Sequence, residues 1–278
     1  MQKADFTLFF SMPLDEVDWD NLARSKVVRV MLPLGLADTG TLDRLWSMGV
    51  GVVLRIEEGT YYDQHSPEQI AQRVVDCALH AHVHFAIIGC EPEAHYDWRW
   101  GYDWHQDQAW PHRSAVARTS AAIHNRGYRT ASPGWRMRMI SETDPPEPGW
   151  ATWLEICRIE YDSCDLNGCH LYEYGWESWV DENRFRTTLQ RFMTDYHKDL
   201  VIDEIGVGSG DQVAKMSAYI NIAQIILDDD YILGDRVKML CPFVSNGAPG
   251  NPPVYDPEYI IRDPAAYDLL GTWMSTGT

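Results

Sequence analysis

The sequence is poor in basic residues and has no long apolar run. Its 278 residues include 23 Lys plus Arg and 41 Asp plus Glu, so the formal charge is 23 − 41 = −18. Nucleic acids and anionic membrane surfaces are bound by clustered positive charge, so this balance argues against both as partners. No stretch approaches the roughly 20 apolar residues of a membrane-spanning helix. We therefore expect a protein that binds neither nucleic acid nor membrane.

Cysteine is also sparse, and the first residues do not resemble a secretory leader. The scattered spacing of the cysteines excludes a disulfide scaffold and fits no zinc site, although Cys164 and Cys169 are close enough to pair. The opening MQKADFTLFFSMP has too short an apolar run and too early an acid for a signal peptide. We expect a soluble protein that acts in the cytoplasm, is released by lysis, or is produced without its leader. The cysteines are Cys77, Cys90, Cys157, Cys164, Cys169 and Cys241.

Short apolar runs alternate with amphipathic stretches along the whole chain, a pattern typical of a parallel sheet buried on both faces. Dividing the chain by eight runs gives about 35 residues per unit, close to the repeat of a (β/α)₈ barrel. We predict a single TIM-barrel domain over residues 1–278 with long, aromatic-rich βα loops. A doubly wound open sheet is the alternative, but the Gly-rich turn after its first strand is missing. The predicted strands lie near Phe6–Phe10, Val27–Met31, Val50–Ile56, His84–Gly89, Arg129–Ala131, Gly168–Tyr172, Leu200–Ile205 and Val237–Phe243.

Helices are predicted between several of these strands. Ser66-Pro67 supplies an N-cap and a first-turn proline before apolar residues spaced four apart. Helical spacing is also found over Phe185–Tyr196 and Val213–Leu227, whereas the first unit offers only Trp19–Ala23. The Pro-rich segment Ser141–Gly149 predicts a loop within the fifth unit rather than a domain boundary.

Two glutamates follow predicted strands at the end where barrel enzymes place their catalytic groups. The run HFAIIG leads to Cys90-Glu91-Pro92, and LVID leads to Glu204. Their separation, 204 − 91 = 113 residues, corresponds to three units, or strand 4 to strand 7. Two carboxylates facing each other across a barrel mouth suit glycoside hydrolysis, in which one protonates the leaving oxygen and the other attacks the anomeric carbon. Glu93 is a competing acid, interpreted as a loop charge.

These strand ends resemble those of clan A glycoside hydrolases, the barrel enzymes that include cellulases, mannanases and β-1,3-glucanases. The resemblance implies that Glu91 is the acid/base and Glu204 the nucleophile of a retaining β-glycosidase. VVRVMLP resembles the clan strand whose arginine supports the nucleophile, which implies that role for Arg29, with a plain salt bridge inside the barrel as its alternative. GCHLYEYG resembles the His-x-Tyr element and implies substrate contacts from His170 and Tyr172.

The sequence departs from the clan pattern at two places. The clan has Asn before the acid/base, where its amide contacts the sugar 2-hydroxyl, and this chain has Cys90, a much weaker donor. Strand 8 lacks the usual terminal Trp, and Phe243 is the nearest aromatic. A carbohydrate-binding barrel that has lost catalysis is therefore a second hypothesis.

Tryptophan is abundant, with 12 residues, and most lie in the segments after strands 4, 5 and 6. The C–H faces of sugars pack on aromatic rings, so these loops predict an oligosaccharide or polysaccharide substrate that is neutral. The competing interpretation is that some tryptophans simply bury long loops, as for Trp150 and Trp153 at helical spacing. The candidates for sugar stacking are Trp98, Trp100, Trp104, Trp135 and Trp176.

His80, His82 and His84 imitate the His-x-His metal pair of amidohydrolases and give a third hypothesis, a metal-dependent hydrolase. They enter strand 4 at its N-terminal end, however, and this end of a barrel contributes to stability rather than catalysis. We therefore predict no metal and no cofactor.

Overall fold

A computed structural model gives the structure of the chain. For residues 106–114, 135–137 and 172–173 only the backbone is described. The described residues are 1–56, 65–89, 106–137, 158, 162–173, 189–190, 198–207, 210–229, 235–243 and 259–276.

All the strand pairs among these residues are parallel, and they form two sheets. Isolated parallel bridges, Phe6 to Leu240 and Ala131 to Leu166, join the sheets at both seams. One sheet has the order β1-β2-β3-β4-β5 and the other β6-β7-β8-β9. The strands are β1 (Leu8–Phe9), β2 (Arg29–Pro33), β3 (Gly51–Ile56), β4 (Val83–Ile88), β5 (Thr130–Ala131), β6 (Trp135–Met137), β7 (Asn167–Glu173), β8 (Leu200–Val207) and β9 (Val237–Pro242).

The predicted (β/α)₈ barrel is confirmed. Each predicted strand range contains or overlaps a strand of the structure. The fifth barrel strand is interrupted at residues 132–134, so β5 pairs with β4 while β6 pairs with β7. This interruption accounts for nine strand labels around an eight-stranded barrel.

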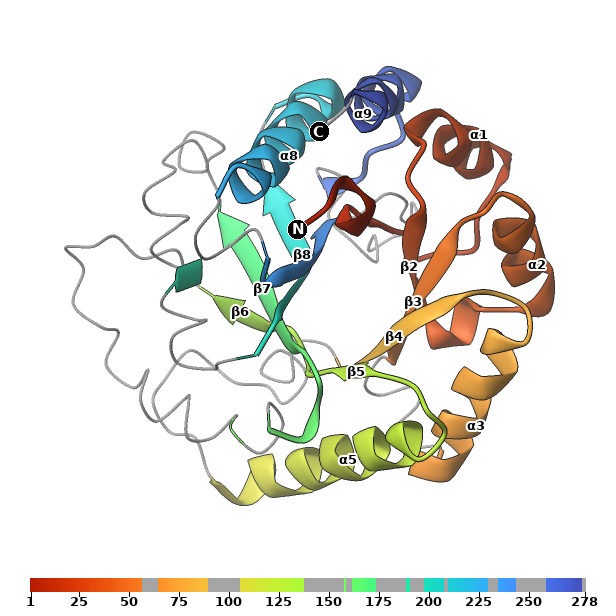
Figure 1. The fold of residues 1–278 in the computed structure, drawn as a ribbon, viewed down its shortest axis with the longest axis vertical. Coiled ribbons are helices and arrows are strands. Elements are labelled where there is room, and N and C mark those ends of the chain that lie inside the picture. Colours follow the sequence, from red (N-terminus) through yellow and green to blue (C-terminus); the bar gives the residue numbers. More distant parts are fainter. Residues whose placement is uncertain are drawn as a thin grey trace, which may run out of the picture.

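Helices surround the strands on the outside (Figure 1). The prediction at Ser66 is confirmed, because its hydroxyl accepts from the Gln69 N–H and Pro67 opens the helix. Residues Trp19–Ala23 lie within the α-helix Glu16–Ser25. Of the segment Phe185–Tyr196, Leu189–Gln190 are helical and the rest lies outside the described residues. The segment Ser141–Gly149 also lies outside them. The helices are η1 (Lys3–Asp5), α1 (Glu16–Ser25), η2 (Leu34–Leu36), α2 (Thr39–Ser47), α3 (Pro67–Ala78), α5 (Gln106–His124), α8 (Gln212–Leu227) and α9 (Pro264–Ser275).

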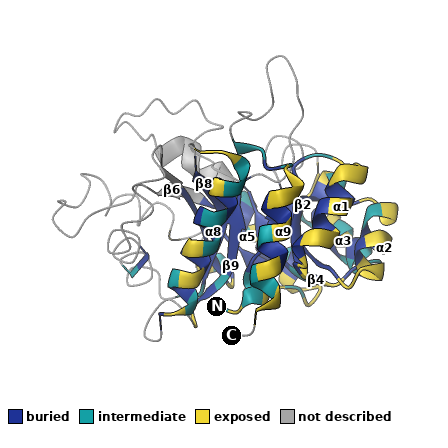
Figure 2. Cartoon of the chain, turned by 90° about the horizontal axis from the view of Figure 1, so that it is seen from above, coloured by how far each residue is buried: buried dark blue, intermediate teal, exposed yellow. Residues whose placement is uncertain are grey.

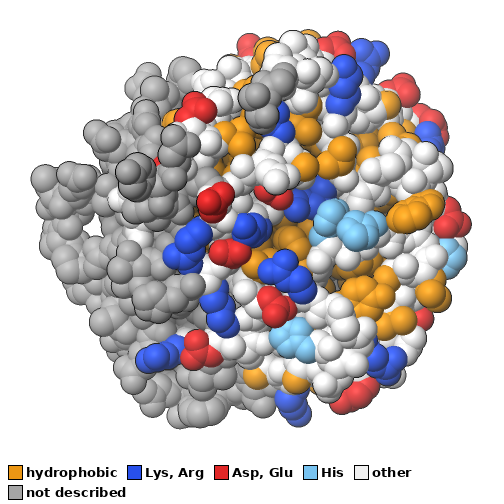
Figure 3. All heavy atoms as spheres, in the orientation of Figure 1, with side chains coloured by type: hydrophobic (Ala, Val, Ile, Leu, Met, Phe, Trp, Pro, Cys, Tyr) orange, Lys and Arg blue, Asp and Glu red, His pale blue; other side chains and the backbone are white. Residues whose placement is uncertain are grey.

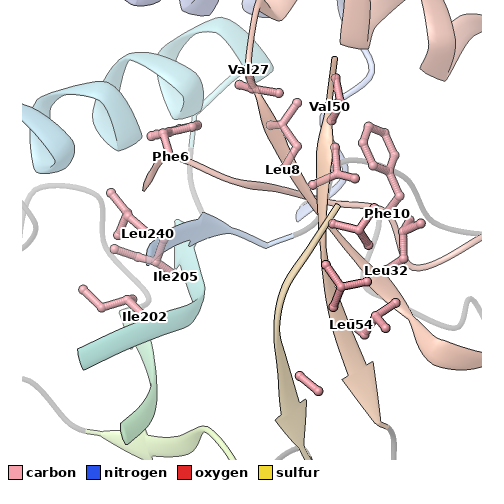
Figure 4. Close-up of a cluster of buried hydrophobic side chains, with 14 of the residues drawn as sticks. Phe6, Leu8, Phe10, Val27, Leu32, Val50, Leu54, Ile202, Ile205 and Leu240 are labelled. Carbon is pink, nitrogen blue, oxygen red and sulfur yellow. The ribbon is translucent and has the colours of Figure 1, made fainter. Parts of the chain in front are cut away.

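The alternation of side chains along the strands divides the core in two. Leu8 and Phe10 belong to the layer between strands and helices, the same cluster as Leu32 and Leu54 (Figure 4). Phe9 belongs instead to the cluster inside the barrel. Nearly all the described side chains of the strands are buried, whereas the helices expose their outer faces (Figure 2). The inner cluster contains Phe9, Met31, Val53, Phe85, Ile87, Ala131, Leu166, Val201, Met239, Cys241 and Phe243.

The described cysteines are buried free thiols. Cys164 and Cys169 are not joined to each other, so the disulfide considered from their spacing does not form. Burial raises the pKa of the Cys77 thiol to about 11. Such a thiol stays protonated at neutral pH and is a poor nucleophile.

Charges of both signs are interspersed on the face seen in Figure 3 rather than gathered into a basic patch. Arg236 and Lys238, for example, both pair with Asp199, at 3.8 and 3.6 Å. None of the helices in the described ranges has the length and hydrophobicity required to cross a membrane.

Candidate active site

Glu204 lies in the C-terminal half of β8, and its carboxylate is held by two cationic or polar side chains from other strands. Arg55 Nη1 donates to Oε1, and His170 Nδ1 lies 3.3 Å from Oε2. The Glu204 side chain is only 4% exposed. Catalytic groups of barrel enzymes come from this end of the strands. Glu204, which the sequence predicts as a site residue, therefore lies in a buried environment with polar partners.

Asp203, the residue before Glu204, contacts the same histidine. His170 Nε2 lies 3.0 Å from Asp203 Oδ2, and both side chains are fully buried. In a regular strand, consecutive residues point to opposite faces. Here the register passes from Cys169–Ile202 to His170–Glu204 and so skips Asp203. This β-bulge lets two consecutive carboxylates reach one imidazole.

Gly134 provides the space for the imidazole ring. A Cβ atom at this position would lie 2.2 Å from the ring atoms Cδ2 and Nε2 of His170, and 2.4 Å from Asp203 Oδ1. No larger residue fits without displacing the ring or the backbone. Gly134 is in the interruption between β5 and β6, so the break in the fifth strand adjoins the site.

Arg55 makes the ion pair with Glu204 that the sequence resemblance implied for Arg29. Arg55 is the penultimate residue of β3, is 3% exposed, and has its guanidinium 5.0 Å from the Phe9 ring. Arg55 is the single charged residue in the buried strand GVVLRI. A lone arginine near the end of an apolar strand is the sequence feature that could have identified it as a site residue.

Arg29 is the first residue of β2 and lies toward the opposite end of the barrel. Its Nε donates to Thr7 Oγ1 at 2.8 Å, and Nη2 donates to the carbonyls of Asp5 and Lys238. The structure therefore does not bring Arg29 to Glu204. It gives Arg29 the structural salt bridge considered as its alternative, with Asp5 at 3.4 Å.

The other predicted residues divide into those placed by the backbone and those outside the described ranges. Tyr172 follows His170 by two positions in β7 and is paired in register with Gly206, and Trp135 is paired with Cys169. Phe243 follows β9 and packs on Phe9, with ring centroids 6.0 Å apart. Glu91, Cys90, Trp98, Trp100, Trp104 and Trp176 lie outside the described residues.

The histidines of the His-x-His motif lie at the start of β4. His82 and His84 stack edge to face with centroids 4.4 Å apart. Burial, together with the positive charges of Arg29 and His82, lowers the pKa of His84 to about 4. In the described parts of the chain, no three Cys, His, Asp or Glu side chains are grouped so as to hold a metal ion.

Comparison with known proteins finds matches among solved structures, whereas no family model and no curated protein matches the sequence. A GH128 (subgroup II) endo-β-1,3-glucanase from Sorangium cellulosum is 15% identical with a TM-score of 0.57, over 95% of this chain and 97% of that one. An endo-1,4-β-D-mannanase from Thermotoga petrophila is 13% identical with a TM-score of 0.58, over 96% and 98%. A GH128 (subgroup VI) exo-β-1,3-glucanase from Aureobasidium namibiae is 12% identical with a TM-score of 0.58, over 99% and 98%. The fold is that of the clan A glycoside hydrolases.

Arg55, His170, Asp203 and Glu204 lie together toward the C-terminal ends of the strands, the end at which barrel enzymes place their catalytic groups. The sequence resemblance to the clan is therefore confirmed for the fold. These side chains can hold the Glu204 carboxylate in a fixed orientation. Arg55 compensates the charge at one carboxylate oxygen, and His170 orients the other oxygen.

Proposed function

We propose that the protein is a retaining β-glycosidase and that Glu204 is its nucleophile. The observation that carries the proposal is the buried carboxylate of Glu204, oriented by Arg55 and His170 at the C-terminal end of β8. A nucleophilic carboxylate needs to be ionised and aimed, and an adjacent guanidinium together with an imidazole serves both needs.

In the proposed reaction, a Glu204 oxygen attacks the anomeric carbon while Glu91 protonates the departing glycosidic oxygen. The product of this step is a glycosyl-enzyme ester on Glu204. Glu91, now ionised, takes a proton from water, and the resulting hydroxyl attacks the same carbon and releases Glu204. Two carboxylates suffice for this chemistry, so the mechanism requires no metal and no cofactor.

The substrate in this proposal is a neutral β-linked glycan. The structural neighbours named above act on β-1,3-glucans and β-1,4-mannans, which are uncharged polymers. A chain with a formal charge of −18 is compatible with an uncharged substrate. The candidate stacking residues Trp98, Trp100, Trp104, Trp135 and Trp176, with Tyr172, would supply the apolar surfaces of the cleft.

Catalysis is favoured over the alternatives by the surroundings of Glu204. Burying several charged side chains costs solvation energy. Sugar binding alone does not require a buried charged group at this position, whereas a nucleophilic carboxylate does. A metal-dependent hydrolase based on His82 and His84 is disfavoured by location, because both histidines are at the start of β4.

The proposal is tested by comparing Glu204→Gln with the wild type on curdlan, laminaritriose and β-mannan, with reducing-sugar release as the readout. Loss of the nucleophile is expected to lower kcat by roughly 10⁴-fold or more on the accepted substrate. Glu68→Gln is the matched control, because Glu68 is an exposed glutamate in the first turn of α3. Full activity of Glu204→Gln would show that the nucleophile is another residue.

A further inference from the structure

We propose that Asp203 is a positioning residue that keeps His170 doubly protonated, so that an imidazolium faces Glu204. The proposal concerns a residue that the two-carboxylate mechanism does not use. Its catalytic consequence rests on the proposed function, whereas the charge state of His170 can be measured without any substrate.

The argument begins with the two nitrogens of the His170 ring. Nε2 lies 3.0 Å from Asp203 Oδ2, and Nδ1 lies 3.3 Å from Glu204 Oε2. A neutral imidazole has one N–H and one lone pair, so it can donate to only one of two carboxylates. Its other nitrogen would then turn a lone pair toward a carboxylate oxygen. Only the doubly protonated ring donates to both.

Charge balance within the buried group leads to the same protonation state. Asp203, Glu204, Arg55 and His170 all have side chains that are at most 4% exposed. With an imidazolium, two negative charges meet two positive charges. With a neutral ring, one of the two negative charges has no counter-charge among these four side chains, and an uncompensated buried charge is costly.

Other described titratable groups near the cluster do not change this balance. Cys169 interacts electrostatically with Asp203, and Cys241 interacts with Asp203, Glu204 and Arg55. Burial raises the pKa of both thiols well above the usual value, so both are neutral at physiological pH. Arg55 donates to the other oxygen of Glu204 and lies over the Phe9 ring.

The described hydrogen bond of the Asp203 side chain is the one to His170, so its carboxylate is available to stabilise the imidazolium. Its Oδ1 has no hydrogen-bond partner in the described part of the chain, while its Oδ2 faces His170. The bulge in β8 is what turns Asp203 toward the same side as Glu204. A backbone irregularity that adds a second carboxylate to one imidazole indicates a specific use for that carboxylate.

During turnover this arrangement would act when Glu204 loses its charge in the glycosyl-enzyme. Asp203 then remains as the counter-charge of His170, so the imidazolium persists beside the ester. When water displaces the sugar, the carboxylate of Glu204 re-forms next to a ready hydrogen-bond donor. Removal of the Asp203 charge is therefore expected to lower kcat for hydrolysis of the glycosyl-enzyme.

The test is nitrogen NMR of the full chain with labelled histidine, and His170→Gln identifies the His170 signals by their loss. In the wild type, both ring nitrogens are expected to carry protons from pH 5 to about 8. In Asp203→Asn, the ring is expected to lose one of these protons within the same pH range, because one of the two carboxylates that accept from it is gone. Asp43→Asn is the matched control, because Asp43 bonds the partly exposed His80 and not His170.

A neutral His170 at pH 7 in the wild type would overturn the proposal, and so would an unchanged titration in folded Asp203→Asn. The wild-type spectrum decides the first point even if Asp203→Asn does not fold. Loss of glycan hydrolysis in all assays with an intact imidazolium would instead contradict the proposed function and leave the charge state of His170 established.

Discussion

Arg55 in β3 donates to Glu204 in β8, and this buried ion pair joins residues 149 positions apart. Removing one partner of a buried pair leaves an uncompensated charge, which costs about 3–5 kcal/mol. We expect Arg55→Met to lower the free energy of unfolding by that amount, as measured by urea denaturation. The double variant Arg55→Met, Glu204→Gln should recover part of the loss, because it removes both charges.

An exposed ion pair provides the comparison for this experiment. Arg24 and Asp268 lie 3.1 Å apart with side chains that are 46% and 59% exposed. Arg24→Met is expected to change stability by less than about 1 kcal/mol. Equal effects of Arg24→Met and Arg55→Met would contradict the account of Glu204 as a buried carboxylate that depends on its arginine.

Gly134→Ala is expected to disturb the site through His170. The added Cβ would lie 2.2 Å from the imidazole, so the ring or the backbone of residues 132–134 must shift. Overpacking of this kind typically costs about 1–3 kcal/mol. We also expect lower kcat, because the displaced ring no longer orients Glu204. Denaturation and glycan hydrolysis measure the two effects.

Gly40→Ala is the matched control for this substitution. Gly40 lies in the first turn of α2, where the nearest atom to an added Cβ is the Asp38 carboxylate at 3.2 Å. Alanine favours helix, so stability should stay the same or increase. If Gly134→Ala were as stable and active as Gly40→Ala, close packing of His170 on residue 134 would be excluded.

The sequence located the strands but left their inward faces undetermined. When both faces of a strand are apolar, alternation alone does not tell which residues point into the barrel. Arg29 and Arg55 illustrate this, because both are arginines in apolar runs and only Arg55 is at the C-terminal end. Asp203 was missed for a different reason. Alternation predicts that Asp203 and Glu204 point apart, and the bulge in β8 that brings them together has no sequence signature.

His84 should make stability depend on pH. Burial, with help from Arg29 and His82, lowers its pKa to about 4, below the unfolded value of about 6.5. As the pH falls, the unfolded chain therefore binds the proton before the folded chain does. The contribution of neutral His84 to the free energy of unfolding is complete above pH 6.5 and is lost as the pH falls toward 4. Because the side chain is partly exposed, we expect a loss of about 1–2 kcal/mol rather than the full linkage value.

The measurement is the free energy of unfolding of His84→Gln between pH 7 and pH 4. Its decline toward low pH should be shallower than that of the wild type. His65→Gln is the control, because His65 is exposed, and it should keep the wild-type slope. Identical slopes for all three proteins would show that His84 does not titrate abnormally.

Glu91 is expected to act as acid/base, and Glu93 two residues later is its matched control. Glu91→Gln should lower kcat about 10²–10⁴-fold on glycans, whose leaving groups need protonation. Measured as kcat/KM, which reports formation of the glycosyl-enzyme, the loss should be much smaller on aryl glycosides, whose leaving groups depart without protonation. Glu93→Gln should resemble the wild type on both substrates. The reverse pattern would transfer the role to Glu93.

Covalent trapping tests the central claim most directly. A 2-deoxy-2-fluoro-β-glycoside with a good leaving group slows hydrolysis of the glycosyl-enzyme, so the sugar remains attached to the nucleophile. Peptide mass spectrometry of the inactivated protein is predicted to find one fluorosugar on Glu204. A sugar attached to any other residue, or turnover of the natural glycan with no covalent adduct and with inverted product configuration, would contradict the account.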